Sequence, residues 1–301
     1  MSDDAMVGRI LSRRDALGMA AHAGLGLALV GGFGRIVRAA DTTQPATTPL
    51  VVSPALTEGP FFVDEKLNRS DLIGDTTRPS VINGLRLMLG FTVYKLEGKD
   101  YSPMKNAHVD VWHADTDGAY SDEGGGMNRY DTSGQRWLRG YQVTDAAGAA
   151  TFKTIIPGWY NGRTPHIHFK VRTFSPAGQS TAEFTSQLFF HDEDLDKIYS
   201  QAPYNSRGKR ESTNADDGIY SEREADGTTA GSLLTLELKK TADGKALTNH
   251  ISIVVNDALL HVQRGGRGPG PGDRGFGNGR PPGPPPDGPD GFDGGPPPPP
   301  F

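Results

Sequence analysis

The sequence predicts an all-β fold: a β-sandwich core with long irregular loops and little helix. Short runs rich in β-branched and aromatic residues recur between residues 85 and 255, and turn signals separate them. Seven or more strands at this spacing are typical of a sandwich. The chain has no cysteine, so the expected domain at 41–263 must be stabilised by an ordinary hydrophobic core.

The expected strands follow one another with short connections. They lie at residues 85–96, 108–112, 150–155, 166–174, 184–190, 233–238 and 250–255. Turn signals between them include EGKD at 97–100, DAAG at 145–148 and ADGK at 242–245. One short helix is expected at 194–200. The Gly/Asn/Asp-rich stretch 204–227 predicts an irregular loop, where a pocket rim or a subunit contact can be built.

Residues 1–40 are interpreted as a twin-arginine export signal. They contain SRRDAL at 12–17, then an Ala/Gly-rich apolar run, then small residues near Ala40 that suit a peptidase. The run is too mildly hydrophobic for a convincing membrane span. An uncleaved N-terminal anchor is the alternative. Export predicts a periplasmic or extracellular protein, with association to the membrane or cell wall left open.

Residues 264–301 consist almost entirely of Gly, Pro, Asp and Arg, which cannot form a core. Four arginines balance four aspartates, and the glycines follow no strict three-residue period, so neither a cationic arm nor a collagen helix is indicated. We expect a disordered tail. A spacer is the simpler role, and docking to a cell-wall or Pro-recognising partner is the alternative.

Charge and motifs narrow the function classes. The chain carries −5, and residues 1–40 carry a net +2, so loss of the signal leaves −7. An acidic domain is an unsuitable nucleic-acid binder. The absence of cysteine excludes thiolate metal sites and cysteine nucleophiles. Neither a Gly-rich phosphate loop nor a nucleophile elbow occurs.

Two histidines and two tyrosines predict a metal site. His166 and His168 are two positions apart in an expected strand, so both imidazoles can face one ion while Ile167 points the other way. Tyr160 precedes them by six residues, and Tyr120 closes an earlier turn. Phenolate is a hard anionic donor that ionises near neutral pH only beside a strong Lewis acid. Iron(III) is therefore the expected metal.

Three further segments extend this pattern. AHVDVWHADTDGAY at 107–120, RGYQVTDAAG at 139–148 and PGWYNGRTPHIH at 157–168 resemble, in that order, the motifs of intradiol ring-cleavage dioxygenases. TEGPFF at 57–62 is similar to a segment before the first core strands of these enzymes. The resemblance covers residues 57–255 and also implies a β-sandwich. The loop between Tyr160 and His166 is shorter than in the catechol and protocatechuate enzymes, and no helical N-terminal domain precedes the core.

The resemblance implies roles for particular residues. Tyr120, Tyr160, His166 and His168 would hold a ferric ion. Tyr160 would leave the metal when a catechol-type substrate binds through both oxygens. Arg163 would stabilise negative charge on the ring carbon that dioxygen attacks, and Gln187 would orient the substrate. The product would be a muconate-type diacid, and assembly into a homo-oligomer is left open.

Two other functions remain as alternatives. The first is a secreted β-sandwich module that binds metal or polyphenols without dioxygenase turnover. The second is a carbohydrate hydrolase, for which no Asp/Glu pair stands out. Calcium is a weaker explanation for the acidic residues near Tyr120, which are interpreted as turn formers: Asp115, Asp117 and Asp122.

Other conspicuous side chains have simpler interpretations. Trp112 and Trp159 are expected to pack, with a pocket wall as the alternative for Trp159. His113 is expected to make a hydrogen bond at the surface or beside the site, and not to bind metal.

Overall fold

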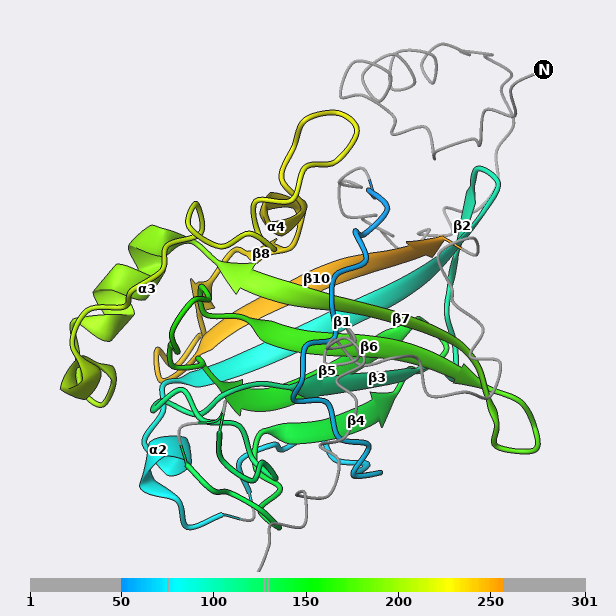
Figure 1. Ribbon diagram of the computed structural model, residues 1–301. Helices are drawn as coiled ribbons and strands as arrows, with labels where there is room; N and C mark the ends of the chain where they lie inside the picture. The colour runs from blue at the N-terminus through cyan, green and yellow to red at the C-terminus, as the bar shows by residue number, and fades with distance from the viewer. Residues whose placement is uncertain (1–49, 75, 127, 129, 257–301) are drawn as a thin grey trace, which may run out of the picture. The chain divides into compact units, whose positions relative to one another are not determined.

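The computed structural model describes residues 50–256 except 75, 127 and 129, and it is a two-sheet β-sandwich (Figure 1). The predicted fold class is confirmed. The strands are β1 (Arg86–Glu97), β2 (Asp100–Pro103), β3 (His108–Trp112), β4 (Arg139–Val143), β5 (Ala149–Ile155), β6 (Ile167–Phe174), β7 (Ser180–Phe190), β8 (Thr235–Leu236), β9 (Lys239–Lys240) and β10 (Leu247–Asn256). The helices are α2 (Pro79–Ile82), α3 (Asp192–Tyr199), α4 (Ala230–Leu233) and the 3-10 turn η1 (Tyr204–Arg207).

The first sheet has the order β2-β1-β10-β9, with β5 also paired to β1. The second sheet has the order β4-β3-β6-β7-β8. Alternation along each strand places one set of side chains between the sheets. On β1 this set is fully buried and consists of Leu87, Leu89, Phe91 and Val93. On β6 it consists of Ile167, Phe169 and Val171. His168, Lys170 and Arg172 therefore point to the outer face of the second sheet.

Most predicted elements are found within a few residues of their expected bounds, but one prediction was wrong in part. Of the expected strand 233–238, only the two-residue strand β8 forms, and the short helix α4 reaches into its first residue. Within α4, Gly231 lies directly against the ring of Tyr220, where a side chain would not fit. Leu234 and Leu236 still bury their side chains in the core, which explains the apolar pattern. Strands β2, β4 and β9 were not anticipated.

A segment before the first strand, residues 54–65, crosses the outer face of the second sheet and is called the covering segment (blue in Figure 1). Leu56 N donates to Thr185 O at 3.0 Å, and Gln187 Nε2 donates to Thr57 O at 2.8 Å. Lys170, buried beneath the segment, forms an ion pair with Glu58. The covering segment therefore shields this part of the outer face and pairs with the charge of Lys170.

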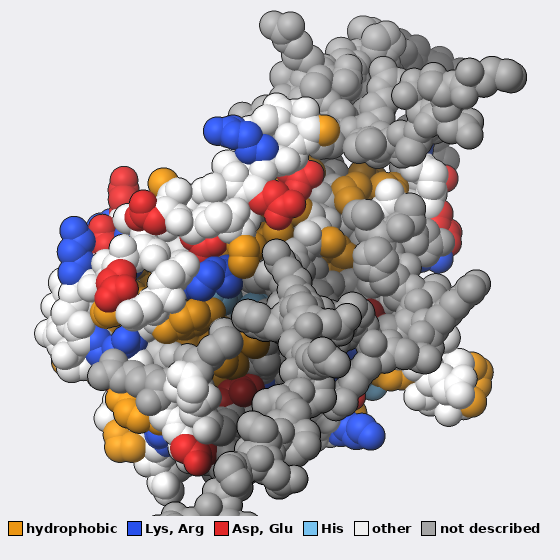
Figure 2. Space-filling model, viewed as in Figure 1, with side chains coloured by type: hydrophobic (Ala, Val, Ile, Leu, Met, Phe, Trp, Pro, Cys, Tyr) orange, Lys and Arg blue, Asp and Glu red, His pale blue; other side chains and the backbone are white. Residues whose placement is uncertain are grey.

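The predicted irregular loop 204–227 is confirmed, with η1 at its start. On the face shown in Figure 2, acidic and basic side chains are interspersed and do not form a patch of one sign. No helix among the described residues is long and apolar enough to cross a membrane. The expected export signal at 1–40 and the tail at 264–301 lie outside the described residues.

Candidate metal centre

The four predicted ligands converge at the start of β6, on the outer face of the second sheet. His166 Nε2 lies 3.1 Å from His168 Nε2 and 3.1 Å from the hydroxyl oxygen of Tyr160. The hydroxyl oxygen of Tyr120 lies 3.5 Å from the same His166 nitrogen. Tyr120 comes from the loop after β3 and Tyr160 from the loop after β5. Three separate segments thus bring two phenols and two imidazoles to one point.

These separations fit a single bound metal ion. Two ligand atoms about 2.1 Å from one ion lie roughly 3.0 Å apart at a right angle and roughly 3.4 Å apart at the tetrahedral angle. Two of the observed separations, both 3.1 Å, fall in this range, and the third, 3.5 Å, lies just above it. Among the described residues, no group of three or more His, Cys, Asp and Glu side chains could hold a metal. The fit therefore depends on the two tyrosines as donors.

Protonation of the histidines also suits a metal. His166 Nδ1 donates to Thr164 O at 2.7 Å, which leaves the Nε2 lone pair directed toward the other three side chains. Burial lowers the pKa of His166 and of His168 well below the usual value, which favours the neutral rings that can bind a metal. His168 Nδ1 is buried without a hydrogen-bond partner.

The pKa values of the two phenols are shifted in the opposite direction, upward. Burial raises the pKa of Tyr120 well above 10, and it raises the pKa of Tyr160 as well, because a phenolate is costly in a desolvated site. A metal cation between the two oxygens would offset this cost. Tyr120 is 1% exposed, whereas Tyr160 is only partly buried. The two tyrosines therefore differ in their access to solvent.

Arg163 and Gln187, the other predicted site residues, lie together beside this cluster. Arg163 Nη2 donates to Gln187 Oε1 at 2.6 Å, and Arg163 Nη1 lies 3.5 Å from His166 Nε2. Gln187 is fully buried on β7, directly across from His168 in the sheet. The structure thus brings all six predicted site residues together.

Comparisons with known proteins identify the family. The sequence model of the dioxygenase family matches residues 57–209, just over half of the chain. The chain belongs to the intradiol dioxygenase family. It is 32% identical over 114 residues to a catechol 1,2-dioxygenase of Acinetobacter baylyi, covering 36% of this chain and 32% of that protein. It is 28% identical over 161 residues to a chlorocatechol 1,2-dioxygenase of Cupriavidus pinatubonensis, covering 49% of this chain and 56% of that protein.

A solved structure supports the same assignment. The fold is similar to that of an intradiol ring-cleavage dioxygenase from Tetranychus urticae, with a TM-score of 0.57 and 28% identity. This match covers 71% of the present chain and 97% of the mite protein. By contrast, the chain spans a third to just over half of the length of the two curated bacterial relatives.

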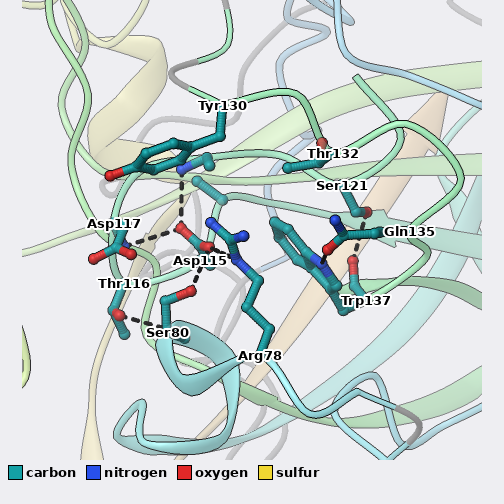
Figure 3. A network of polar contacts seen from close by, with 12 residues as sticks. Arg78, Ser80, Asp115, Thr116, Asp117, Ser121, Tyr130, Thr132, Gln135 and Trp137 are labelled. Atoms are coloured by element: carbon teal, nitrogen blue, oxygen red, sulfur yellow. Dashed lines mark hydrogen bonds and ion pairs between the residues drawn. The ribbon is translucent and has the colours of Figure 1, made fainter. Parts of the chain in front are cut away.

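Asp115 bonds the backbone next to Tyr120 and belongs to a network with Arg78 and Ser80, which Figure 3 shows. Its buried carboxylate accepts hydrogen bonds from Arg78 Nε at 2.6 Å and from Ser80 Oγ at 2.7 Å. It also accepts from the backbone nitrogens of Asp117 and Ala119. The two backbone donors lie two and four residues after Asp115, so the carboxylate forms a turn, as predicted.

The two tyrosine loops are packed backbone to backbone. Gly158 N donates to Asp115 O at 2.9 Å, which joins the loop of Tyr160 to that of Tyr120. Gly118 has φ +77° and lies against the carbonyl oxygen of Trp159, where a Cβ would overlap that oxygen. The two tyrosine loops therefore meet at a contact that leaves no room for a side chain at residue 118.

Aromatic side chains enclose the cluster. Phe61, in the covering segment, stacks on Tyr120 with ring centroids 4.4 Å apart. Trp112 stacks on His168 at 4.9 Å and 8°, so the expected packing role of this tryptophan includes orienting an imidazole. Trp159 packs in the main core and is covered by the guanidinium of Arg207, which confirms packing. Sequence reasoning had no signal for the Trp112–His168 stack, because it depends on strand pairing.

The hydrogen bond expected for His113 is present, but the surface alternative was wrong, and one residue beside the site was missed. His113 is not at the surface: it is buried, with Nε2 2.6 Å from Thr154 Oγ1 and Nδ1 2.8 Å from Ala114 O. Burial lowers its pKa to about 4. Asp217, which sequence reasoning missed, is fully buried and accepts from Arg163 Nε at 2.8 Å. It lies in the irregular loop, among several similar acidic residues.

A cavity of about 950 Å³ is lined by residues other than this cluster. Its lining comes from the start of α3 and from residues 214–229, and it includes none of the four converging side chains. We assign it no part in the chemistry of the metal centre.

Proposed function

We propose that this protein is an iron(III)-dependent intradiol dioxygenase. It would cleave a catechol-type ring between its two hydroxyls with O2 and give a muconate-type diacid. The observation that carries this proposal is the convergence of two phenols and two imidazoles, with Arg163 and Gln187 beside them. The 28% identity to the mite intradiol enzyme over nearly its whole length supports it.

In this proposal Tyr120, Tyr160, His166 and His168 hold the ferric ion. When bound, iron(III) would accept electron density from the two catechol oxygens and so make the ring reactive toward dioxygen. Tyr120 is buried and stacked under Phe61, so it is the phenol held in place. Tyr160 is the more exposed phenol and is suited to move away, with its oxygen accepting a proton from a substrate hydroxyl.

Arg163 and Gln187 act on the substrate side. Arg163 presents Nη1 toward the metal-binding nitrogen of His166, so its cation lies where negative charge would develop on the ring. Gln187 is fixed by its bond to Thr57 O, and its oxygen faces Arg163. The stacked aromatic rings of Phe61 and Tyr120 exclude water from one side of the cluster.

Oxygen uptake across a panel of catechols tests the function. The iron-loaded protein should consume about one O2 per ring, and the product should absorb as a conjugated diacid. Replacing Tyr120 or Tyr160 with Phe removes one ligand oxygen and keeps the ring, so the visible tyrosinate-to-iron band should shift or fade while circular dichroism is unchanged. Iron binding and colour without oxygen uptake would favour the binding module instead.

We also propose that the protein is exported by the twin-arginine route to the periplasm or cell exterior. This proposal is supported only by the sequence of residues 1–40. A pathway that carries folded proteins would allow the iron to be acquired before export.

A further inference from the structure

Asp217 is a carboxylate whose hydrogen-bonding capacity is fully used inside the protein. Its Oδ2 accepts from Arg163 Nε at 2.8 Å and from Thr164 N at 2.9 Å. Its Oδ1 accepts from the backbone nitrogens of Ile219 at 2.8 Å and Tyr220 at 3.1 Å. An ionised carboxylate offers about four acceptor sites, and all of them are occupied here. The group is fully buried, so solvent does not compete for these contacts.

These contacts fix the plane of the Arg163 guanidinium. Asp217 holds Nε, and Gln187 Oε1 accepts from Nη2 at 2.6 Å. A guanidinium held at two edges of its rigid fork has little freedom to rotate. The remaining nitrogen, Nη1, is then directed at the metal-binding side of His166, 3.5 Å from Nε2.

We propose that Asp217 is a positioning residue that aims Arg163 Nη1 at the reacting ring. This inference rests on the proposed dioxygenase function. Without this ion pair, the Arg163 side chain would spend most of its time away from the metal centre, because a solvated guanidinium has many rotamers. The ion pair with Asp217 removes that freedom before substrate binds, which is how a protein makes electrostatic stabilisation effective in a transition state.

A purely structural role is the competing explanation. Asp217 also bonds Thr164, Ile219 and Tyr220, and so could serve only to hold its loop. Asn214 anchors the same loop without touching Arg163: its Oδ1 accepts from Thr164 Oγ1 at 2.8 Å, and its Nδ2 donates to Phe190 O at 2.8 Å. Asn214→Ser therefore serves as a matched control for loop anchoring.

The experiment is a double-mutant cycle on oxygen uptake with catechol. Asp217→Asn keeps the shape but replaces one acceptor oxygen by a donor, so it cannot satisfy the four N–H groups. We expect turnover to fall roughly thirtyfold or more, and anaerobic catechol binding to change by less than about threefold. In an Arg163→Leu background the same change should alter turnover by less than about threefold. Asn214→Ser should lower stability but keep turnover within about threefold of the parent.

Arg163→Lys provides a second test that does not depend on the folding of the Asp217 variant. Lysine keeps the charge but cannot bridge Asp217 and Gln187 together, so its turnover should fall close to that of Arg163→Leu. Parent-like turnover of the lysine variant would overturn the proposal. If Asp217→Asn lowers turnover by the same factor with and without Arg163, the proposal is also overturned, because additive effects mean that Asp217 acts independently of the arginine.

A measurement without iron separates this inference from the proposed function. In the metal-free parent, the Nε–H proton of Arg163 should exchange slowly with solvent, and its NMR signal is assigned by its absence from Arg163→Leu. The signal should be lost in Asp217→Asn and kept in Asn214→Ser. Persistence in Asp217→Asn would refute the positioning role. A parent that shows the signal but cleaves no catechol would refute the dioxygenase function and leave the ion pair intact.

Discussion

Replacement of Gly118 by alanine tests whether backbone contact between the two tyrosine loops sets the metal centre. Gly118 has φ +77°, and an added Cβ would overlap the carbonyl oxygen of Trp159 and approach Arg207 Nη1 to 2.5 Å. The left-handed backbone alone costs an alanine about 1 kcal/mol. Overpacking against a fixed backbone atom adds about 1–3 kcal/mol. We therefore expect a total loss of about 2–4 kcal/mol in the free energy of unfolding.

Gly98→Ala is the matched control. Gly98 has φ +64° in the turn between β1 and β2, but no heavy atom lies within 4 Å of its added Cβ. This variant should lose only the backbone contribution of about 1 kcal/mol. It should also keep its iron and its visible band, because the added Cβ displaces no neighbouring atom.

Urea unfolding of chelator-treated protein gives the stability of both variants, and iron content after gel filtration gives the effect on the metal centre. Gly118→Ala should retain clearly less iron than Gly98→Ala, since the carbonyl of Trp159 must move and Tyr160 moves with it. Equal stability losses and equal iron retention in the two variants would refute the claim that this contact sets the position of the tyrosines.

Three further predictions concern pH, export and the tail. Burial lowers the pKa of His113 to about 4, so its contribution to stability is complete above about pH 6.5 and is lost as the pH falls toward 4. Between pH 7 and 5, His113 should cost the metal-free parent about 2 kcal/mol of its free energy of unfolding, measured by urea titration, and His113→Gln should abolish this part of the loss. Identical pH profiles of parent and variant would contradict this. Arg13→Lys with Arg14→Lys should keep the precursor inside the cell, measured by fractionation, and normal export would exclude the twin-arginine route. Removal of residues 264–301 should change oxygen uptake by less than about twofold if the tail is a spacer, and a large loss would show that it contributes to the site or to assembly.

The sequence was sufficient to place the two histidines together, because the two-residue period of a strand is a local property. His166 and His168 are related by the two-residue period of a strand, and the structure indeed directs them to one point while Ile167 enters the core. Tyr120 and Tyr160 were assigned by resemblance to motifs, since no spacing rule alone relates residues on different loops. Strand positions were predicted well where burial alternates, as in β1 and β6.

Residues that depend on long-range packing could not be predicted. Asp217 is adjacent to Asp216 in an acidic loop, and nothing in the sequence distinguishes them. In the structure, Asp216 is exposed and bonds the backbone of Thr213, whereas Asp217 is fully buried under Arg163, 54 residues earlier in the chain. The same limitation explains His113, whose burial depends on its contact with Thr154 in the first sheet.

Cleavage of catechol in an atmosphere of labelled dioxygen tests the central claim most directly. The iron-loaded protein should convert catechol to a diacid whose mass shows both atoms of one labelled O2, one in each new carboxyl group. The same reaction should be lost in Tyr120→Phe. A hydroxyaldehyde acid from cleavage outside the hydroxyls, a product without the label, or no consumption of oxygen by any catechol would contradict the account.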